Sequence, residues 1–192
     1  TQSDEWQNYI ASSKPCFISH TDASPTDRGN AMHKLMCCID FNNTYKNGIN
    51  FELERLKSGG FLDEKEINMI SKKSIEKFLF GDIGKRILES PNIYREHRFS
   101  VTIPSKYLTE YSCLDNHYTV MQGAIDCAFS ENNRYVIIDY KTDKISHTDE
   151  LWEKYSKQLK LYKFALEQSE NVKVSELILY SFHLGESYTK KY

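Results

Sequence analysis

The sequence predicts an α/β protein in which helices cover a central mixed β-sheet, with an N-terminal helical portion. Three observations support this fold class. Hydrophobic residues follow a helical period as far as Pro91 and an alternating, strand-like period after it. Asn132 and Asn133 separate two strand-like runs and suit a two-residue hairpin turn, because Asn tolerates positive φ. An amphipathic helix then precedes an apolar strand, which indicates a parallel return to the same sheet.

The chain has 192 residues, enough for one domain with its own core. Residues 1–26 are mixed and polar, and we interpret them as a leading segment or linker. Residues 27–192 are predicted to form a single folded domain. The first residue is Thr1 rather than Met, so we expect a fragment of a larger protein.

Capping signals mark several of the expected helices. Asp27 is expected to cap a helix that carries His33. The asparagine-rich stretch 42–48 is expected to be a loop. Asp63 and Glu66 together resemble a capping box at the start of another helix. The expected helices are 27–39, 51–56, 63–78, 83–88 and 149–167, and the expected strands are 94–103, 118–129, 135–140 and 177–182.

Composition and charge narrow the function classes. The net charge of −2 does not indicate a generally basic surface, so a nucleic acid would need a local basic patch. Lysines gather on the expected helix 149–167, although such groups also occur on ordinary solvated helix faces. Five cysteines without a C-x-x-C pair argue against a zinc site or a disulfide framework and favour reduced, cytoplasmic thiols. No apolar run is long enough to cross a membrane.

The predicted hairpin brings two acidic residues together. A two-residue turn at 132–133 places Asp126 opposite Asp139, with Cβ atoms roughly 4.5–5.5 Å apart on one face. Lys141 lies two residues beyond Asp139 and therefore points to the same side, whereas Ile125 is expected to point away. Facing carboxylates repel each other, and Mg²⁺ or Mn²⁺, which prefer oxygen ligands, would compensate the repulsion.

A simpler interpretation of these residues stays open. Asp126 and Asp139 could be exposed acids on a solvated sheet face, with Lys141 as an ordinary salt-bridge partner. The placement of both acids on one face favours the metal site. Glu96, on a predicted strand, could point to the site as an additional acid or form a surface salt bridge.

Four segments, taken in order, resemble the motifs of a known family. They are R-G-N-A-M-H at 28–33, G-A-I-D at 123–126, I-I-D-Y-K-T-D at 137–143 and Q-L-K-L-Y at 158–162. The D-Y-K-T-D string alone is moderately specific, whereas the four motifs in this order are strongly so. From about residue 28 to residue 184, the chain resembles the RecB-like branch of the PD-(D/E)xK nucleases, and within it the AddA-type nuclease domains of bacterial helicase–nucleases.

The resemblance implies a restriction-endonuclease-like core and a metal-dependent DNA nuclease, expected to be an exonuclease in double-strand-break repair and recombination. It implies that His33, Asp126, Asp139 and the backbone carbonyl of Tyr140 bind the metal. For His33, the alternative is a structural role, which is common for a lone histidine on a helix.

The resemblance also assigns roles on the strand and helix that follow. Lys141 would be the catalytic lysine. Gln158 and Tyr162, four residues apart and so on one helix face, would line the site and touch DNA. Their alternatives are a solvated polar residue and a core residue. Tyr155 is expected to belong to the core.

Cofactors and partners follow from the same resemblance. We expect Mg²⁺, with Mn²⁺ able to substitute, and no iron–sulfur cluster, since no cysteine follows Cys127. The expected partners are DNA, covalently linked helicase domains and a second helicase–nuclease subunit, in the bacterial cytoplasm and without a membrane. No Walker A motif is present, so an ATP-driven motor would lie on another part of the polypeptide. The alternatives are an inactive nuclease fold that binds DNA or acts as a scaffold, and a stand-alone exonuclease.

Overall fold

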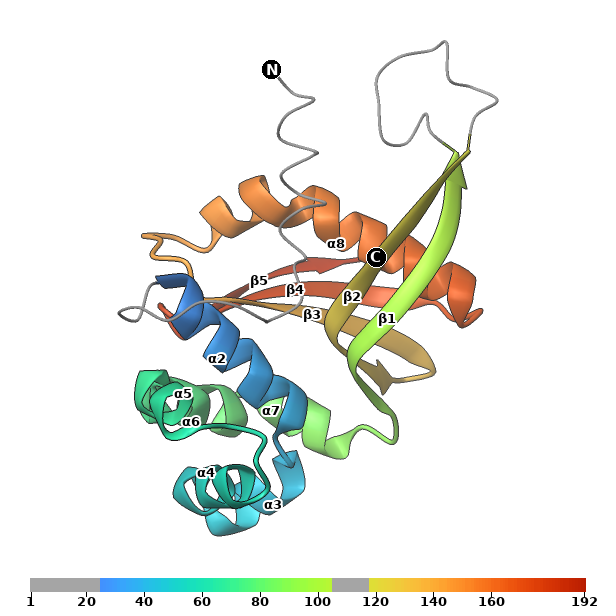
Figure 1. The fold of residues 1–192 in the computed structure, drawn as a ribbon. Coiled ribbons are helices and arrows are strands. Elements are labelled where there is room, and N and C mark those ends of the chain that lie inside the picture. The colour runs from blue at the N-terminus through green and yellow to red at the C-terminus, as the bar shows by residue number, and fades with distance from the viewer. Residues whose placement is uncertain (1–24, 105–117) are drawn as a thin grey trace.

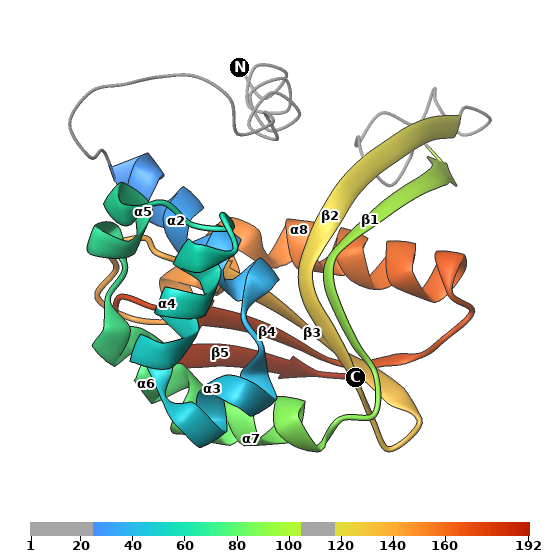
Figure 2. The ribbon, with the colours of Figure 1, turned by 60° about the horizontal axis from the view of Figure 1, so that its bottom comes forward.

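The computed structural model describes residues 25–104 and 118–192, so the leading segment predicted at 1–26 lies almost wholly outside the described residues. A five-stranded sheet lies between two layers of helices (Figures 1 and 2). The strands are β1 (Ile93–Pro104), β2 (Tyr118–Glu131), β3 (Arg134–Lys141), β4 (Val174–Ser181) and β5 (Glu186–Lys191). They follow this order in the sheet, and only β3 and β4 run parallel. The predicted fold class and the parallel return are confirmed.

The helices divide between the two faces of the sheet. The first six described helices gather on one face, and a long helix between β3 and β4 covers the other (Figure 1). None of the described helices is long and apolar enough to cross a membrane. The helices are α2 (Pro25–Cys38), α3 (Phe41–Asn47), α4 (Ile49–Ser58), α5 (Glu64–Met69), α6 (Lys72–Phe80), α7 (Asp82–Glu89) and α8 (Asp149–Ser169).

The helical layer corrects three local predictions. The stretch predicted as an asparagine-rich loop forms α3, because the Asp40 side chain accepts the Asn43 N–H and caps the helix. Asp27 lies in the first turn of α2 and is not its cap. The helix predicted at 63–78 begins with the expected capping box but breaks at Ile70, and Ser71 caps a second helix.

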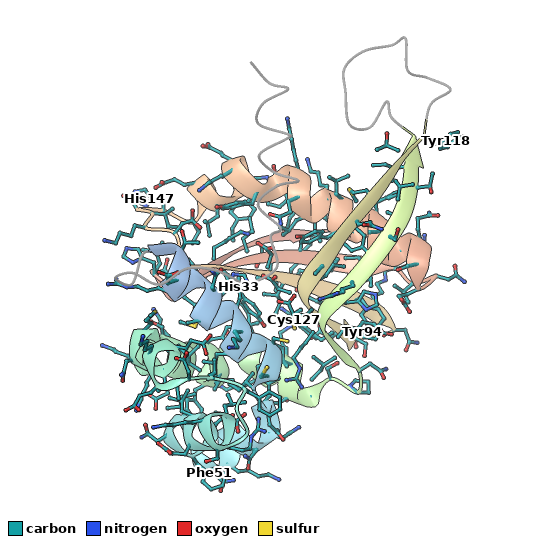
Figure 3. The ribbon with its side chains drawn as sticks, in the orientation of Figure 1. His33, Phe51, Tyr94, Tyr118, Cys127 and His147 are labelled. Carbon is teal, nitrogen blue, oxygen red and sulfur yellow. The ribbon has the colours of Figure 1, made fainter. Side chains whose placement is uncertain are left out.

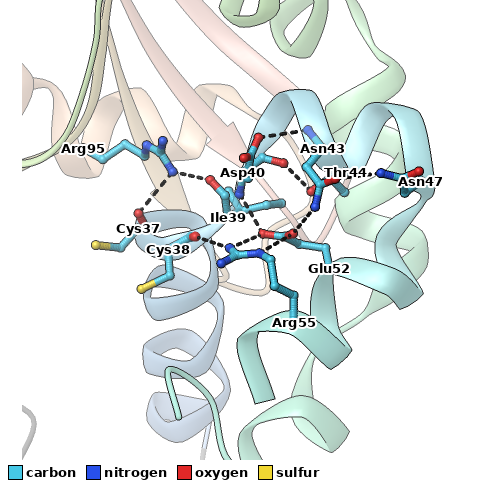
Figure 4. A network of polar contacts seen from close by, with 10 residues as sticks. All are labelled: Cys37, Cys38, Ile39, Asp40, Asn43, Thr44, Asn47, Glu52, Arg55 and Arg95. Carbon is cyan, nitrogen blue, oxygen red and sulfur yellow. Dashed lines mark hydrogen bonds and ion pairs between the residues drawn. The ribbon is translucent and has the colours of Figure 1, made fainter. Parts of the chain in front are cut away.

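A buried carboxylate ties the first helices together (Figure 4). Glu52, on α4, is fully buried and accepts the backbone N–H of Asp40 at 2.7 Å and the guanidinium of Arg55. Arg95, on β1, donates to the carbonyl of Ile39 just after α2. Polar contacts therefore fix α2, α3 and α4 to one another and to the edge of the sheet.

The central hairpin forms as predicted. Asn132 and Asn133 have φ values of 51° and 60°, and the predicted register holds from the turn as far as Cys127. The sheet and the two helical layers enclose two hydrophobic cores. The helical-layer core, on the α2–α7 side, includes Leu35, Phe78, Cys127, Phe129, Ile138 and Tyr140. The α8-side core includes Phe99, Ile125, Ala128, Ile137, Leu159 and Leu179.

Candidate active site

Along β2, the regular alternation of side chains between the two faces of the sheet is interrupted near Asp126. Ile125 packs in the α8-side core, but Cys127, two residues later, packs in the helical-layer core. In a regular strand these side chains would share a face. The alternation therefore breaks at Asp126. The prediction that Ile125 points away from the side of Asp139 was wrong, because Ile125 packs on the α8 side together with Ile137.

The neighbouring strand has its own irregularity at the same level. The register of the flanking β1–β2 pairs places Glu96 opposite Asp126. Glu96 has a φ of 46°, in the left-handed region that residues other than Gly, Asn and Asp rarely adopt. Such a conformation costs on the order of 1–3 kcal/mol and is often retained at functional sites. Two acids thus meet where both strands depart from regular geometry.

Asp126 connects β2, β3 and α2. One of its oxygens, Oδ2, accepts the Tyr140 N–H at 2.8 Å and lies 3.3 Å from Nδ1 of His33. Burial raises the pKa of Asp126, but His33 and then Lys141 lower it, and the net pKa lies below its usual value. Tyr140 therefore meets the site through its backbone, while its ring lies in the helical-layer core.

Three side chains form a candidate cation site. One ligand atom from each of His33, Glu96 and Asp126 lies within 4.8 Å of the other two. His33 comes from α2, which Figure 3 shows beside the strands. Burial raises the pKa of Glu96, and the nearby Asp126 charge raises it further, as expected for two neighbouring carboxylates, which repel each other. An imidazole nitrogen and crowded carboxylate oxygens fit a divalent cation, which would relieve this repulsion.

Asp139 and Lys141 form an ion pair beside this cluster. Lys141 Nζ lies 2.6 Å from Asp139 Oδ2, and the Asp139 side chain is only 2% exposed. Burial raises the pKa of Asp139 to about 6, with Lys141 acting against it and Asp126 adding to it. Burial lowers the pKa of Lys141, but Asp139 and Asp126 raise it more, so the lysine stays charged at neutral pH. Asp139 and Lys141 thus lie near enough to feel the charge of Asp126, but Asp139 is not one of the three residues whose ligand atoms converge, and its role as a metal ligand stays a prediction.

The predicted pair on α8 lies on one helix face. Gln158 Nε2 donates to the Tyr162 hydroxyl at 2.5 Å. The Tyr162 ring meets the Phe99 ring edge to face, with centres 5.7 Å apart. Phe99 in turn covers Gly123, where an added Cβ would approach its ring to 2.7 Å. The glycine of the G-A-I-D motif therefore leaves room for the ring against which Tyr162 packs.

The sequence did not predict the contact of Tyr155 with Lys141, and it left the role of Glu96 undecided. Tyr155 was predicted as a core residue, and it does pack partly against the α8-side core. Its ring also lies 4.1 Å from Lys141 Nζ. Its position three residues before Gln158, nearly one helical turn, was the available signal. Glu96, for which the sequence left two roles open, belongs to the candidate cation site.

Comparisons with known proteins agree with this arrangement. The profile of the PD-(D/E)XK nuclease superfamily matches residues 8–191. A protein of Clostridium kluyveri, named as a subunit of an ATP-dependent helicase/nuclease, is 36% identical over 186 residues, covering 93% of this chain and 15% of its own length. Proteins of the same name from Clostridium botulinum (strain Okra) and Geobacillus thermodenitrificans are 34% and 30% identical, over 92% and 94% of this chain.

The matches cover most of this chain but only a small part of each relative. The chain is matched over almost its whole length, but it spans only 14% to 16% of the length of these three relatives. The family profile covers both the helical layer and the sheet, and so includes all of the site residues described above. The chain belongs to the PD-(D/E)XK nuclease superfamily.

Proposed function

We propose that the chain is a divalent-metal-dependent nuclease that hydrolyses phosphodiester bonds of DNA, with Mg²⁺ as the cation and Mn²⁺ as a substitute. The observation that carries the proposal is the grouping of His33, Glu96 and Asp126 within 4.8 Å of one another, beside the Asp139–Lys141 ion pair. A scaffold that binds no cation would gain nothing from placing the carboxylates of Glu96 and Asp126 this close together, because they repel each other.

Each residue has a role in the proposed reaction. Asp126, Asp139, His33 and the carbonyl of Tyr140 would hold the cation, and Glu96 adds a further carboxylate. A bound divalent cation lowers the pKa of water and neutralises negative charge on a phosphate. Lys141 carries a fixed positive charge that would stabilise the charge developing on the phosphate in the transition state.

Helix α8 would contact the DNA strand. Gln158 and Tyr162 lie on one face of it and would line the path of the strand. Of the lysines on this helix, Lys154 pairs with Asp143 and Lys163 pairs with Glu167. Phosphate contacts by these two lysines would have to compete with those carboxylates.

The larger assembly is also a proposal. The relatives are named as helicase/nuclease subunits, and this chain matches a small part of each. We propose that it is the nuclease module of such a polypeptide, linked to helicase domains and paired with a second subunit. In this role it would act as an exonuclease on broken DNA in the bacterial cytoplasm.

Cleavage of labelled single-stranded DNA tests the proposal. With Mg²⁺ or Mn²⁺ the chain is expected to cut the strand, and excess chelator is expected to stop it. Asp139→Ala and Lys141→Ala are expected to lose cleavage while still folding, as judged by circular dichroism. Glu153→Gln, on the exposed surface of α8, is the matched control and should cleave normally.

Three outcomes would contradict the proposal. Cleavage that persists in chelator, or in both site variants, would place the activity elsewhere. Absence of cleavage and of metal binding in a folded chain would favour the alternative of an inactive scaffold with a nuclease fold. A stand-alone exonuclease would be favoured instead if the natural polypeptide carried no helicase sequence.

A further inference from the structure

Lys141 has a second contact besides Asp139. Its ammonium nitrogen lies 2.6 Å from Asp139 Oδ2 and 4.1 Å from the centre of the Tyr155 ring. An ammonium group is attracted to the negative face of an aromatic ring, and the attraction grows where water is excluded. The Lys141 side chain is 13% exposed, so this contact lies in a largely dehydrated place.

The Tyr155 ring is itself anchored. Its hydroxyl donates a hydrogen bond of 2.9 Å to Asp143 Oδ1, and Lys154 Nζ lies 2.6 Å from the same oxygen. Asp143 follows Lys141 by two residues, just after the end of β3. The ring is therefore held at its hydroxyl end by the same segment whose lysine it contacts.

The start of α8 is fixed to the segment that leads into it. Glu150 Oε1 accepts the backbone N–H groups of Ser146 and His147, at 2.9 Å and 3.0 Å. Leu151, one residue further, is fully buried in the α8-side core. The turn of α8 that carries Tyr155 is thus held against the end of β3 by both polar and apolar contacts.

We propose that Tyr155 is a positioning residue, whose ring keeps the Lys141 ammonium beside Asp139. A lysine side chain is flexible, and without the ring it would gain conformations that carry its charge away from Asp139. Electrostatic stabilisation of a transition state requires a charge that is already in place. The consequence for catalysis rests on the proposed nuclease function, whereas the positioning rests on the contacts alone.

NMR of the lysine-labelled chain tests the positioning of Lys141 without an activity measurement. The protons on the ε-carbon of Lys141 are expected to resonate upfield of ordinary lysines because of the ring current, with assignment by Lys141→Arg. Tyr155→Phe should retain this shift and Tyr155→Leu should abolish it. An ordinary lysine shift in the unmodified chain, or an unchanged shift in Tyr155→Leu, would overturn the proposal.

Kinetics test the consequence. Tyr155→Leu is expected to lower kcat for single-stranded DNA by about 10- to 30-fold, with KM and the Mn²⁺ concentration for half activity unchanged. Tyr155→Phe should stay within about threefold of the unmodified chain, since it keeps the ring. Tyr135→Leu is the matched control, because Tyr135 packs on the same core at the far end of β3, stacked on Tyr94.

The kinetic outcomes separate the possibilities. A kcat for Tyr155→Leu equal to that of Tyr135→Leu, or a loss that appears only in KM, would overturn the positioning role. Thermal melting of each variant checks that the fold persists. If the unmodified chain cuts no DNA while the lysine shift responds to Tyr155→Leu as expected, the nuclease function fails and the positioning of the lysine stands.

Discussion

Glu96 combines two unfavourable features at a single residue. Its backbone lies in the left-handed region, and its carboxylate faces that of Asp126. Burial and Asp126 raise its pKa above the usual value. A folded-state pKa above the unfolded one means that stability is lost as pH rises through the interval between them. At neutral pH the Glu96 carboxylate therefore lowers the stability of the metal-free fold.

Replacing Glu96 should raise the stability of the metal-free fold and lower DNA cleavage. In chelator, Glu96→Gly is expected to raise the free energy of unfolding by about 1 kcal/mol, because glycine accepts positive φ and removes the repulsion. With Mn²⁺, the same variant is expected to lose at least about tenfold in cleavage, since a ligand is missing. Urea unfolding and the DNA cleavage assay measure the two effects.

The control for Glu96 is another residue with positive φ. Asn171, with a φ of 52°, follows α8, outside the candidate site. Asn171→Gly should leave cleavage unchanged. Lower stability of Glu96→Gly in chelator, or full cleavage activity in that variant, would contradict the view that Glu96 is retained for the metal.

The sequence predicts part of this site and misses part of it for a physical reason. The two-residue turn and the register that it sets suffice to predict that Asp126, Asp139 and Lys141 lie near one another. The reversal of facing at Asp126 cannot be predicted from alternation, because it arises where β1 and β2 leave one core and join the other. Nothing in the residues next to Glu96 marks its left-handed conformation.

At the scale of secondary structure, the sequence did not predict α3 and β5, because their own residues do not favour a helix or a strand. The α3 segment contains three asparagines and is followed by Gly48, yet it is a helix because Asp40 caps it and Glu52 binds its first turn. Strand β5 is polar apart from Tyr188, and it lies at the edge of the sheet, where it pairs only with β4. Tertiary contacts decide both elements, so local patterns do not identify them.

The buried carboxylate of Glu52 gives this helical layer a predictable pH dependence. Burial raises its pKa, but Arg55 and the Asp40 N–H lower it, and the net pKa is below the usual value. A lowered pKa contributes stability above the unfolded-state value of about 4.3, which is lost as pH falls through the folded-state pKa. Acidification should therefore weaken the junction of α3 and α4.

Glu52→Gln should remove this contribution. At pH 7 the variant is expected to unfold with a free energy lower by about 1–3 kcal/mol, because the buried hydrogen-bond network loses its negative charge and one of its two acceptor oxygens. The difference from the unmodified chain should shrink at acid pH. Urea unfolding at several pH values measures it, with Glu54→Gln on the exposed face of α4 as control. A difference that is constant with pH would exclude Glu52 as its source.

At the scale of the whole molecule, one arginine joins the helical layer to the sheet. Arg86, on α7, pairs with Glu131 at 2.8 Å and with Glu176 on β4. The Glu176 side chain is only 7% exposed, and its next cation, Lys191, is 4.0 Å away. Removing Arg86 would therefore leave a buried carboxylate with little compensation.

Arg86→Ala is expected to lower the free energy of unfolding by about 3 kcal/mol, because one partner of a buried ion pair is lost. Arg134→Ala, at the exposed end of the neighbouring hairpin, should change it by less than about 0.5 kcal/mol. Urea unfolding of both variants measures the difference. Equal effects would mean that the ion pairs of Arg86 add nothing measurable to the packing of α7 on the sheet.

The proposed function requires a cation held between α2 and the strands β1, β2 and β3. Calorimetric titration with Mn²⁺ tests this most directly, comparing the unmodified chain with Asp126→Asn and with the surface control Glu153→Gln. We expect saturable binding by the unmodified chain and the control, and binding weakened at least about tenfold by Asp126→Asn. Equal Mn²⁺ affinity in all three proteins, or no binding by the folded unmodified chain, would contradict it.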